Sequence, residues 1–521
     1  MKHAIRRLHW TLGLAAAMGM GSAWAQSSGL PALGDGESIS LSAERQLGDR
    51  IARELYRDPD FLEDPVLDEY IQQLWAPLVK AAASRGELSS ELQERFAWRI
   101  LLGRDRSVNA FALPGGYLGV HLGLIAVVGS HDELASVLAH ELSHVTQRHI
   151  ARGMSDQAKM TPWVIGSMIL GVLAASKSPQ GAQALIVGGQ AAAVQSQLSY
   201  SRDMEREADR VGYGILVDAG YDPKGFVGMF AKLQQAAGLN DSGAFPYLRS
   251  HPLTSERLAD MQARQQLNTS APGTAADMAQ AMLSARARVL SQNNPDALKA
   301  WIQEAEQPTT RSMPAQRAGA LYAATLAHLQ MRNMAAAERT LQALGPLVAA
   351  ADHVPTSEAS RTSALAAKRW LRLLRAEVAF KQERFDEVLQ TVIPVQNGAA
   401  LQRPELMAVA QALARMPSHP LQQDITGQLR QWVQAAPHDA PAWDALSRLL
   451  SKQGQALASL RAEGEAQIAR LDWSGGIDRL RAAQDLARTG RLRPGEHIEA
   501  SIVDARLRYA QDNWLALQKQ R

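Results

Sequence analysis

The chain has 521 residues, of which 46% are hydrophobic, 5% are aromatic and none is cysteine, and its formal net charge is +3. This length suggests two to four domains, and the lack of cysteine excludes disulfides, thiol catalysis and thiolate metal sites. The three basic residues of the first 25 account for the net charge. The rest of the chain is therefore near neutral, and we expect no nucleic-acid partner.

The first 25 residues have the three parts of a secretory signal. A basic start is followed by an apolar stretch over about 8–20 and by Ala23-Trp24-Ala25. We predict a signal peptide over residues 1–25, cleaved after Ala25, and a periplasmic location. The alternative is an uncleaved anchor helix, but the apolar stretch is short for a membrane span.

Residues 26–270 have the pattern of a mainly helical unit with a small sheet. Apolar residues recur at helical spacing over 41–56 and 65–83, while 96–102 and 110–120 are the best strand candidates. Later apolar runs between 163 and 194 are each too short to span a bilayer, so we expect a helical hairpin and no membrane span in the mature chain.

A motif within a predicted helix indicates a metal site. Ser130 and Glu133 have the spacing of a capping box, and the helix that they open should run to about Arg152. His140 and His144 lie four residues apart on that helix, which places both imidazoles on one face, as a tetrahedral zinc ion requires. We predict one Zn²⁺ per subunit at these histidines.

The remaining parts of a zinc hydrolase site must come from carboxylates. Glu141 is placed to act as the general base on a zinc-bound water. Glu205 is the strongest candidate for the third ligand, because Asp209, one turn later, can hold the outer ring nitrogen of a zinc-bound histidine. Glu207 points about 200° around the same helix and is expected to be a solvated or inter-helix carboxylate.

His251 precedes Pro252 at the start of another predicted helix and has two competing functional roles. It could stabilise the oxyanion of the tetrahedral intermediate, or it could close the site as a fourth ligand; a plain helix-start histidine is the structural alternative. His149 lies five residues after His144, which turns it to another side of the helix, and His121 and His131 have no partner spacing. We expect all three to be structural or surface residues.

A segment before the metal helix is a candidate for binding substrate. It has an extended character interrupted by a turn and includes Asn109, Ala110, Phe111, Gly115 and Gly116. At the edge of a sheet, such a strand would pair with a substrate chain through main-chain hydrogen bonds and hold it across the metal. The alternative is an ordinary core strand.

Residues 275–521 have the pattern of helix after helix with short polar turns. Three stretches, at 317–341, 375–395 and 461–486, resemble one another loosely, and Trp443 begins the spacing of a tetratricopeptide first helix. We predict an α-helical domain like tetratricopeptide repeats, with an ordinary helical bundle as the alternative.

Four motifs in this order resemble the metallopeptidase family of HtpX-type and prenyl-CAAX endopeptidases. They are the 109–116 segment, His140 to His144, Ser201-Arg202 with Glu205 to Asp209, and His251-Pro252. The resemblance implies a mainly α, gluzincin-type zinc peptidase domain with a small β-sheet, followed by the helical repeats.

With the signal and the repeats, the resemblance also implies partners. These are unfolded or misassembled outer-membrane β-barrel proteins, together with the β-barrel assembly machinery, which the repeats would contact; the protein could be peripheral to the outer membrane. An alternative is a repeat-based adaptor or chaperone in which proteolysis is minor or latent. A third hypothesis, an exopeptidase, needs a feature that recognises a chain end, and we find none in the sequence.

Overall fold

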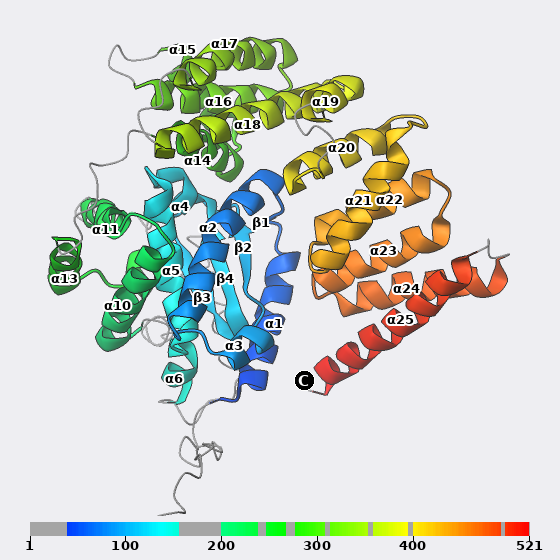
Figure 1. Cartoon of the computed structure of the whole chain (residues 1–521), viewed down its shortest axis with the longest axis horizontal. Helices are drawn as coiled ribbons and strands as arrows, with labels where there is room; N and C mark the ends of the chain where they lie inside the picture. Colours follow the sequence, from blue (N-terminus) through cyan, green and yellow to red (C-terminus); the bar gives the residue numbers. More distant parts are fainter. Residues whose placement is uncertain are drawn as a thin grey trace, which may run out of the picture. The chain divides into compact units, whose positions relative to one another are not determined.

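The computed structural model describes eight stretches of the chain (Figure 1), namely residues 39–155, 200–237, 246–266, 277–307, 313–352, 358–393, 400–490 and 495–519. The predicted signal peptide, the apolar hairpin within 163–194 and the joint between the two predicted domains lie outside these residues. The described part is mainly helical with one small sheet, which confirms the predicted class.

The sheet is mixed and has the strand order β1-β2-β4-β3. Strands β2 and β4 are parallel, while β1 pairs with β2 and β3 pairs with β4 in antiparallel fashion. The predicted strand at 96–102 begins only at Arg99, because Phe96 ends the preceding short helix. The bounds are β1 Phe61–Leu62, β2 Arg99–Gly103, β3 Ala110–Leu113 and β4 Tyr117–His121.

The turn between β3 and β4 depends on its glycines. Gly115 and Gly116 have φ values of 71° and 82°, a region that side-chain-bearing residues rarely adopt. A Cβ at Gly116 would lie 2.8 Å from that of Phe96, and one at Gly115 would lie 2.8 Å from Arg45 of the first helix. The turn is therefore packed closely against its neighbours.

The helices of the first half surround a central helix, α5. This helix packs against β3 on one side and against α2, α10 and α11 on the others, and Figure 1 shows it between the sheet and α10. The bounds are α1 Leu41–Arg57, α2 Pro65–Ser84, α3 Ser90–Arg95, α4 Leu122–Val127, α5 His131–Thr146, α6 His149–Ser155, α10 Arg202–Asp218, α11 Lys224–Ala237, α12 Tyr247–Ser250 and α13 Ser255–Gln266.

Two local features fix how α5 meets its neighbours. Ser130 caps α5 by accepting a hydrogen bond from the Glu133 N–H, as predicted. Gly212 of α10 faces the α5 backbone, and a Cβ there would lie 3.1 Å from atoms of Ala139 and His140. The absence of a side chain at Gly212 thus lets α10 approach α5 closely at the first predicted metal ligand.

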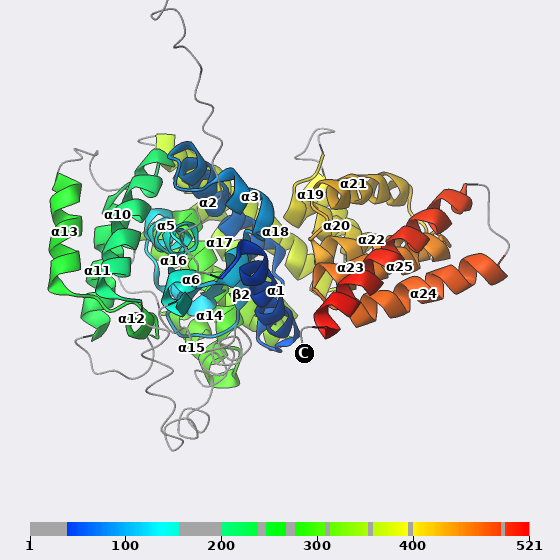
Figure 2. The ribbon, with the colours of Figure 1, turned by 90° about the horizontal axis from the view of Figure 1, so that it is seen from below.

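The second half is a succession of helices that pack on their neighbours in sequence. Both views show α22 to α25 as one such series (Figures 1 and 2). The bounds are α14 Met278–Ser291, α15 Pro295–Glu306, α16 Pro314–Gln330, α17 Met334–Asp352, α18 Glu358–Lys381, α19 Phe385–Val392, α20 Arg403–Arg415, α21 Leu421–Ala435, α22 Ala440–Lys452, α23 Ala456–Ala469, α24 Trp473–Thr489 and α25 Glu496–Gln518. Their identity as tetratricopeptide repeats stays a prediction.

The largest apolar core continues from the first half into the second. It extends from Leu62 to Val378 and includes Leu122 and Ile125 of α4 as well as Met282 of α14. A domain boundary near residue 270 also stays a prediction, but this core is shared across it.

Acidic residues around the start of α2 bind arginines of the later helices. Asp64 lies 2.6 Å from Arg286, while Glu69, Asp68 and Glu63 pair with arginines of other helices. These other pairs are Glu69 with Arg369, Asp68 with Arg403, and Glu63 with Arg470. Among the described helices, none combines the length and the apolar character that crossing a membrane requires.

Candidate metal centre

Four side chains from three parts of the chain meet in the interior. His140 and His144 come from α5, Glu205 from α10, and His251 from the residue that ends α12. All four are at most 1% exposed. Their ligand atoms lie within 4.8 Å of one another, so the structure brings together the three predicted ligands and His251.

The distances between these ligand atoms suit a metal ion with tetrahedral coordination. The Nε2 atoms of His140 and His144 are 3.0 Å apart, and each lies 3.5 Å from an oxygen of Glu205. Nδ1 of His251 is 3.4 Å from His140 Nε2 and 2.9 Å from Glu205 Oε1. A tetrahedron with bonds of about 2.0–2.1 Å has edges of about 3.3 Å. Three imidazoles and a carboxylate therefore fit a divalent transition metal such as zinc.

Glu141 lies beside this cluster and is not part of it. Its Oε2 accepts a hydrogen bond of 2.9 Å from the Ala112 N–H of β3, and its Oε1 is 3.5 Å from His251 Nε2. Among the described residues, that Oε1 is buried without a hydrogen-bond partner. Burial raises the pKa of the Glu141 carboxyl above its ordinary value. A carboxylate with a raised pKa and a free oxygen suits a general base.

Asp209 lies beside the first histidine, where its spacing predicts it. Its Oδ1 lies 3.0 Å from His140 Nδ1, the ring nitrogen that faces away from the cluster. Burial alone would raise the pKa of Asp209, but hydrogen bonds from Arg257 and His140 hold it below its ordinary value. Asp209 is thus an ionised acceptor that can fix the tautomer and direction of the His140 ring.

Arg257 was not predicted as a site residue. Its guanidinium donates two hydrogen bonds to Asp209, of 2.6 and 2.8 Å, and lies 2.7 Å from Glu205 Oε2. It also donates to the Pro252 carbonyl and so connects the segment of His251 to α10. The only sequence signal is its place on the helix that follows His251-Pro252.

His149 also contacts the cluster, which its spacing did not predict. The predicted long helix ends at Thr146, Arg148 has a φ of 53°, and α6 begins at His149. This break returns the His149 ring to the cluster, where its Nδ1 lies 2.8 Å from His144 Nδ1. An unbroken helix would have turned it away. His121 and His131 instead contact Ser107 and Asp277, outside the cluster.

Two tyrosines cover the histidines. The Tyr200 ring stacks on His144, with centroids 3.7 Å apart and planes inclined by 22°. The Tyr247 ring stacks on His251 at 4.5 Å and 26°. Neither residue has a motif spacing that would have predicted it.

The predicted substrate segment contains an edge strand. Within the described residues, β3 pairs only with β4. Because the Asn109 carbonyl accepts from the His121 N–H, the antiparallel alternation directs the main-chain groups of Ala110 and Ala112 toward the free edge. Phe111 lies between them, and its ring covers Gly119.

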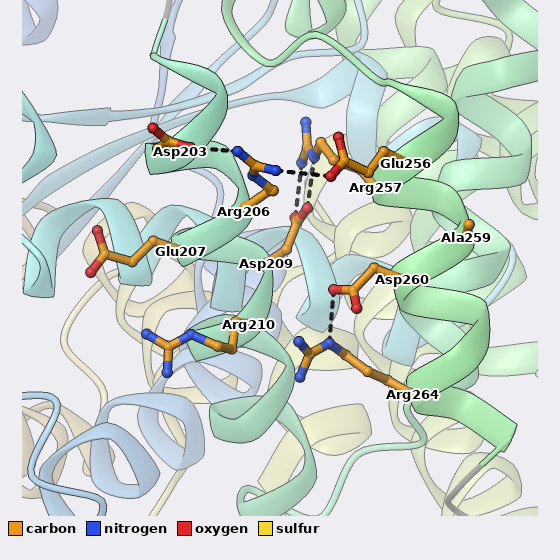
Figure 3. A pocket seen from close by; sticks show the side chains of 10 residues that line it. All are labelled: Asp203, Arg206, Glu207, Asp209, Arg210, Glu256, Arg257, Ala259, Asp260 and Arg264. Carbon is orange, nitrogen blue, oxygen red and sulfur yellow. Dashed lines mark hydrogen bonds and ion pairs between the residues drawn. The ribbon is translucent and has the colours of Figure 1, made fainter.

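A hollow of about 670 Å³ lies between α10 and α13, beside the buried cluster. Figure 3 shows its charged lining, with the Asp209 and Arg257 pair between the two helices and the Arg206 and Glu256 pair next to it. Most of these charges are neutralised by one another, and Glu205 of the cluster is not part of the lining.

Comparisons with known proteins agree with this geometry. The model of peptidase family M48 matches residues 68–265. The β-barrel assembly-enhancing protease of Escherichia coli (strain K12) is 29% identical over 477 residues, 90% of this chain and 89% of its own. The protein of the same name from Yersinia pestis is 34% identical over 269 residues, 51% of this chain and 53% of its own.

Another relative matches a shorter part of the chain. The mitochondrial metalloendopeptidase OMA1 of Arabidopsis thaliana is 31% identical over 197 residues, 37% of this chain and 36% of its own. The matched region contains the four clustered side chains together with Glu141. The predicted resemblance is thereby confirmed: residues 68–265 match peptidase family M48, and the chain is a metallopeptidase.

Proposed function

We propose that the protein is a periplasmic zinc endopeptidase that acts on outer-membrane β-barrel proteins during their assembly or quality control. The observation that carries the chemistry is the buried tetrahedral set of His140, His144, Glu205 and His251 next to Glu141. The secretory character of residues 1–25 and the similarity over 477 residues to a β-barrel assembly-enhancing protease support the location and the client class.

In the proposed reaction, α5 provides the general base and β3 provides the edge that pairs with substrate. When bound, zinc would supply a Lewis acid and lower the pKa of a water molecule. Glu141 would accept the proton from that water and pass it to the leaving amine. The Ala112 N–H already orients Glu141, so Ala110 and the Ala112 carbonyl remain to pair with an extended substrate chain.

For the other predicted substrate-binding residues the structure gives less support. Gly115 and Gly116 are buried in the turn against Arg45 and Phe96, and this close packing explains why glycine is needed at both positions. Asn109 and Phe111 direct their main-chain groups toward β4, so we confine the proposed pairing to Ala110 and Ala112.

We further propose that His251 closes the resting site. Its Nδ1 occupies the fourth corner of the ligand set, the position that a catalytic site keeps for water. An active site then requires that the segment with His251 moves away. The geometry favours this role over oxyanion stabilisation, because an oxyanion donor would leave that corner free.

Replacing His251 by alanine should raise the rate of casein cleavage about tenfold, if the open form is about 10% populated in the wild type. His131→Ala, at a histidine outside the cluster, is the control and should leave the rate unchanged. A lower rate in His251→Ala would instead support oxyanion stabilisation, and an unchanged rate would exclude both roles.

A closed site also favours the second candidate function, an adaptor or chaperone with latent proteolysis. Here the helical region would bind clients or the β-barrel assembly machinery. Complementation of an outer-membrane assembly defect by the Glu141→Gln variant separates the two: full rescue would show that binding dominates, and no rescue that cleavage is needed.

The direct test of the endopeptidase function compares an unfolded protein with short peptides as substrates, before and after chelation and zinc addition. Internal cleavage that chelator abolishes and zinc restores is the expected result. Release of terminal residues alone would identify an exopeptidase, and cleavage insensitive to chelator would refute the metal mechanism.

A further inference from the structure

The two histidines of α5 have different kinds of partner at the ring nitrogen that faces away from the cluster. His140 Nδ1 faces Asp209 directly, whereas His144 Nδ1 faces another imidazole, His149, at 2.8 Å. His149 is fully buried, and its Nε2 lies 2.9 Å from Glu207 Oε2. Arg152 donates to the same oxygen at 2.8 Å. A chain of hydrogen bonds thus runs from the buried cluster to a half-buried carboxylate.

The direction of this chain is fixed by the chemistry of neutral imidazole, which has one N–H and one acceptor nitrogen. If the Nε2 of His144 binds zinc, its Nδ1 carries the hydrogen and donates to His149 Nδ1. His149 must then carry its own hydrogen on Nε2 and donate it to Glu207. Glu207 accepts from both His149 and Arg152, so every group of the chain has a partner.

Burial makes a wrong tautomer costly. His149 is fully buried between the two partners, where its Nδ1 can accept from His144 while its Nε2 donates to Glu207. Were the hydrogen of His149 on Nδ1, two N–H groups would face each other at 2.8 Å and the Glu207 carboxylate would keep only Arg152 as a donor. An unsatisfied buried group of this kind costs about 1–3 kcal/mol.

We propose that His149 and Glu207 are positioning residues for the metal ligand His144. Helix α10 then provides a separate carboxylate for each zinc-binding histidine. Asp209 contacts His140 directly, and Glu207 acts on His144 through His149. Figure 3 shows Glu207 and Asp209 on different sides of α10, consistent with these two targets. This inference rests on the proposed zinc site, and it assigns to Glu207 a role beyond that of an inter-helix carboxylate.

The test measures zinc affinity by competition with a chromogenic chelator, using the full-length protein. Glu207→Ala and His149→Asn should each weaken zinc binding about 10–100-fold, the usual cost of losing an outer partner. Glu207→Gln keeps an oxygen that can accept from His149 and should recover most of the affinity. Asp203→Ala is the matched control, since Asp203 is likewise a carboxylate of α10 that pairs with an arginine, in its case Arg206.

A purely structural role would give another result. Glu207→Ala would then lower the melting temperature of the zinc-free protein and leave the zinc dissociation constant unchanged, which would overturn the proposal. Equal weakening by Asp203→Ala would overturn it as well. Failure of the peptidase function is distinguishable, because a wild type that binds zinc but cleaves nothing still yields the affinity ratios.

Discussion

Replacing Glu141 by glutamine should reduce the rate of protein cleavage by about 10²–10⁴-fold, the range for loss of a general base. Glutamine is nearly isosteric, and its carbonyl oxygen can still accept the hydrogen bond from the Ala112 N–H. It has no basic oxygen, so it cannot take a proton from water. The measurement is the initial rate of casein cleavage with zinc in excess.

The control for this variant is zinc content, which should equal that of the wild type because Glu141 lies outside the ligand set. Glu256→Gln, at an exposed carboxylate paired with Arg206, should leave the rate unchanged. If the Glu141 variant cleaved at the wild-type rate with zinc bound, another group would have to be the base.

Replacing Asp64 by asparagine should destabilise the protein by about 3 kcal/mol, because it leaves Arg286 buried with less compensation. The Arg286 guanidinium donates to both oxygens of Asp64, and both side chains are under 10% exposed. Asp64 also caps α2 through the Leu67 N–H, but asparagine caps equally well. The substitution therefore isolates the charge, and urea unfolding at neutral pH measures its contribution.

The pH dependence of the stability difference between wild type and Asp64→Asn tests whether the Asp64 charge causes it. Burial would raise the pKa of Asp64, but Arg286 holds it below its ordinary value. The folded chain therefore binds the proton less tightly than the unfolded chain. The contribution is complete above the unfolded pKa of about 4 and is lost as the pH falls below it. Wild type and variant should thus converge in stability in acid.

The matched control is Asp218→Asn, at a half-exposed pair with Arg85. Such surface pairs contribute about 0–1 kcal/mol. An equal loss in both variants, or a difference for Asp64 that persists in strong acid, would contradict the assignment of the 3 kcal/mol to the buried pair.

The sequence predicts much of the site because its geometry is local. The four-residue spacing of His140 and His144 and that of Glu205 and Asp209 each follow from helical periodicity. Ser130 marks the start of α5 through its cap. The predicted strands at 96–102 and 110–120 appear as β2, β3 and β4, with Pro114 to Gly116 forming the turn.

The unpredicted part depends on where chain segments meet. His149 joins the cluster because α5 ends at Thr146, and no proline or glycine marks that end. Arg257 and Tyr200 reach the site from segments distant in sequence, so no periodicity relates them to His140. Such contacts follow from tertiary packing, which single-sequence patterns do not encode.

The core shared by α4 and α14 restricts how the enzyme can open. Two domains joined by a small polar interface usually rotate about a hinge, whereas a large apolar interface prevents such rotation. Here Leu122, Ile125 and Met282 belong to one continuous core that extends to Val378, and the Asp64–Arg286 pair lies buried near it. Under the proposed closure by His251, access to the cluster then comes from a local rearrangement around that residue, while the helices that share this core, up to Val378, stay in place.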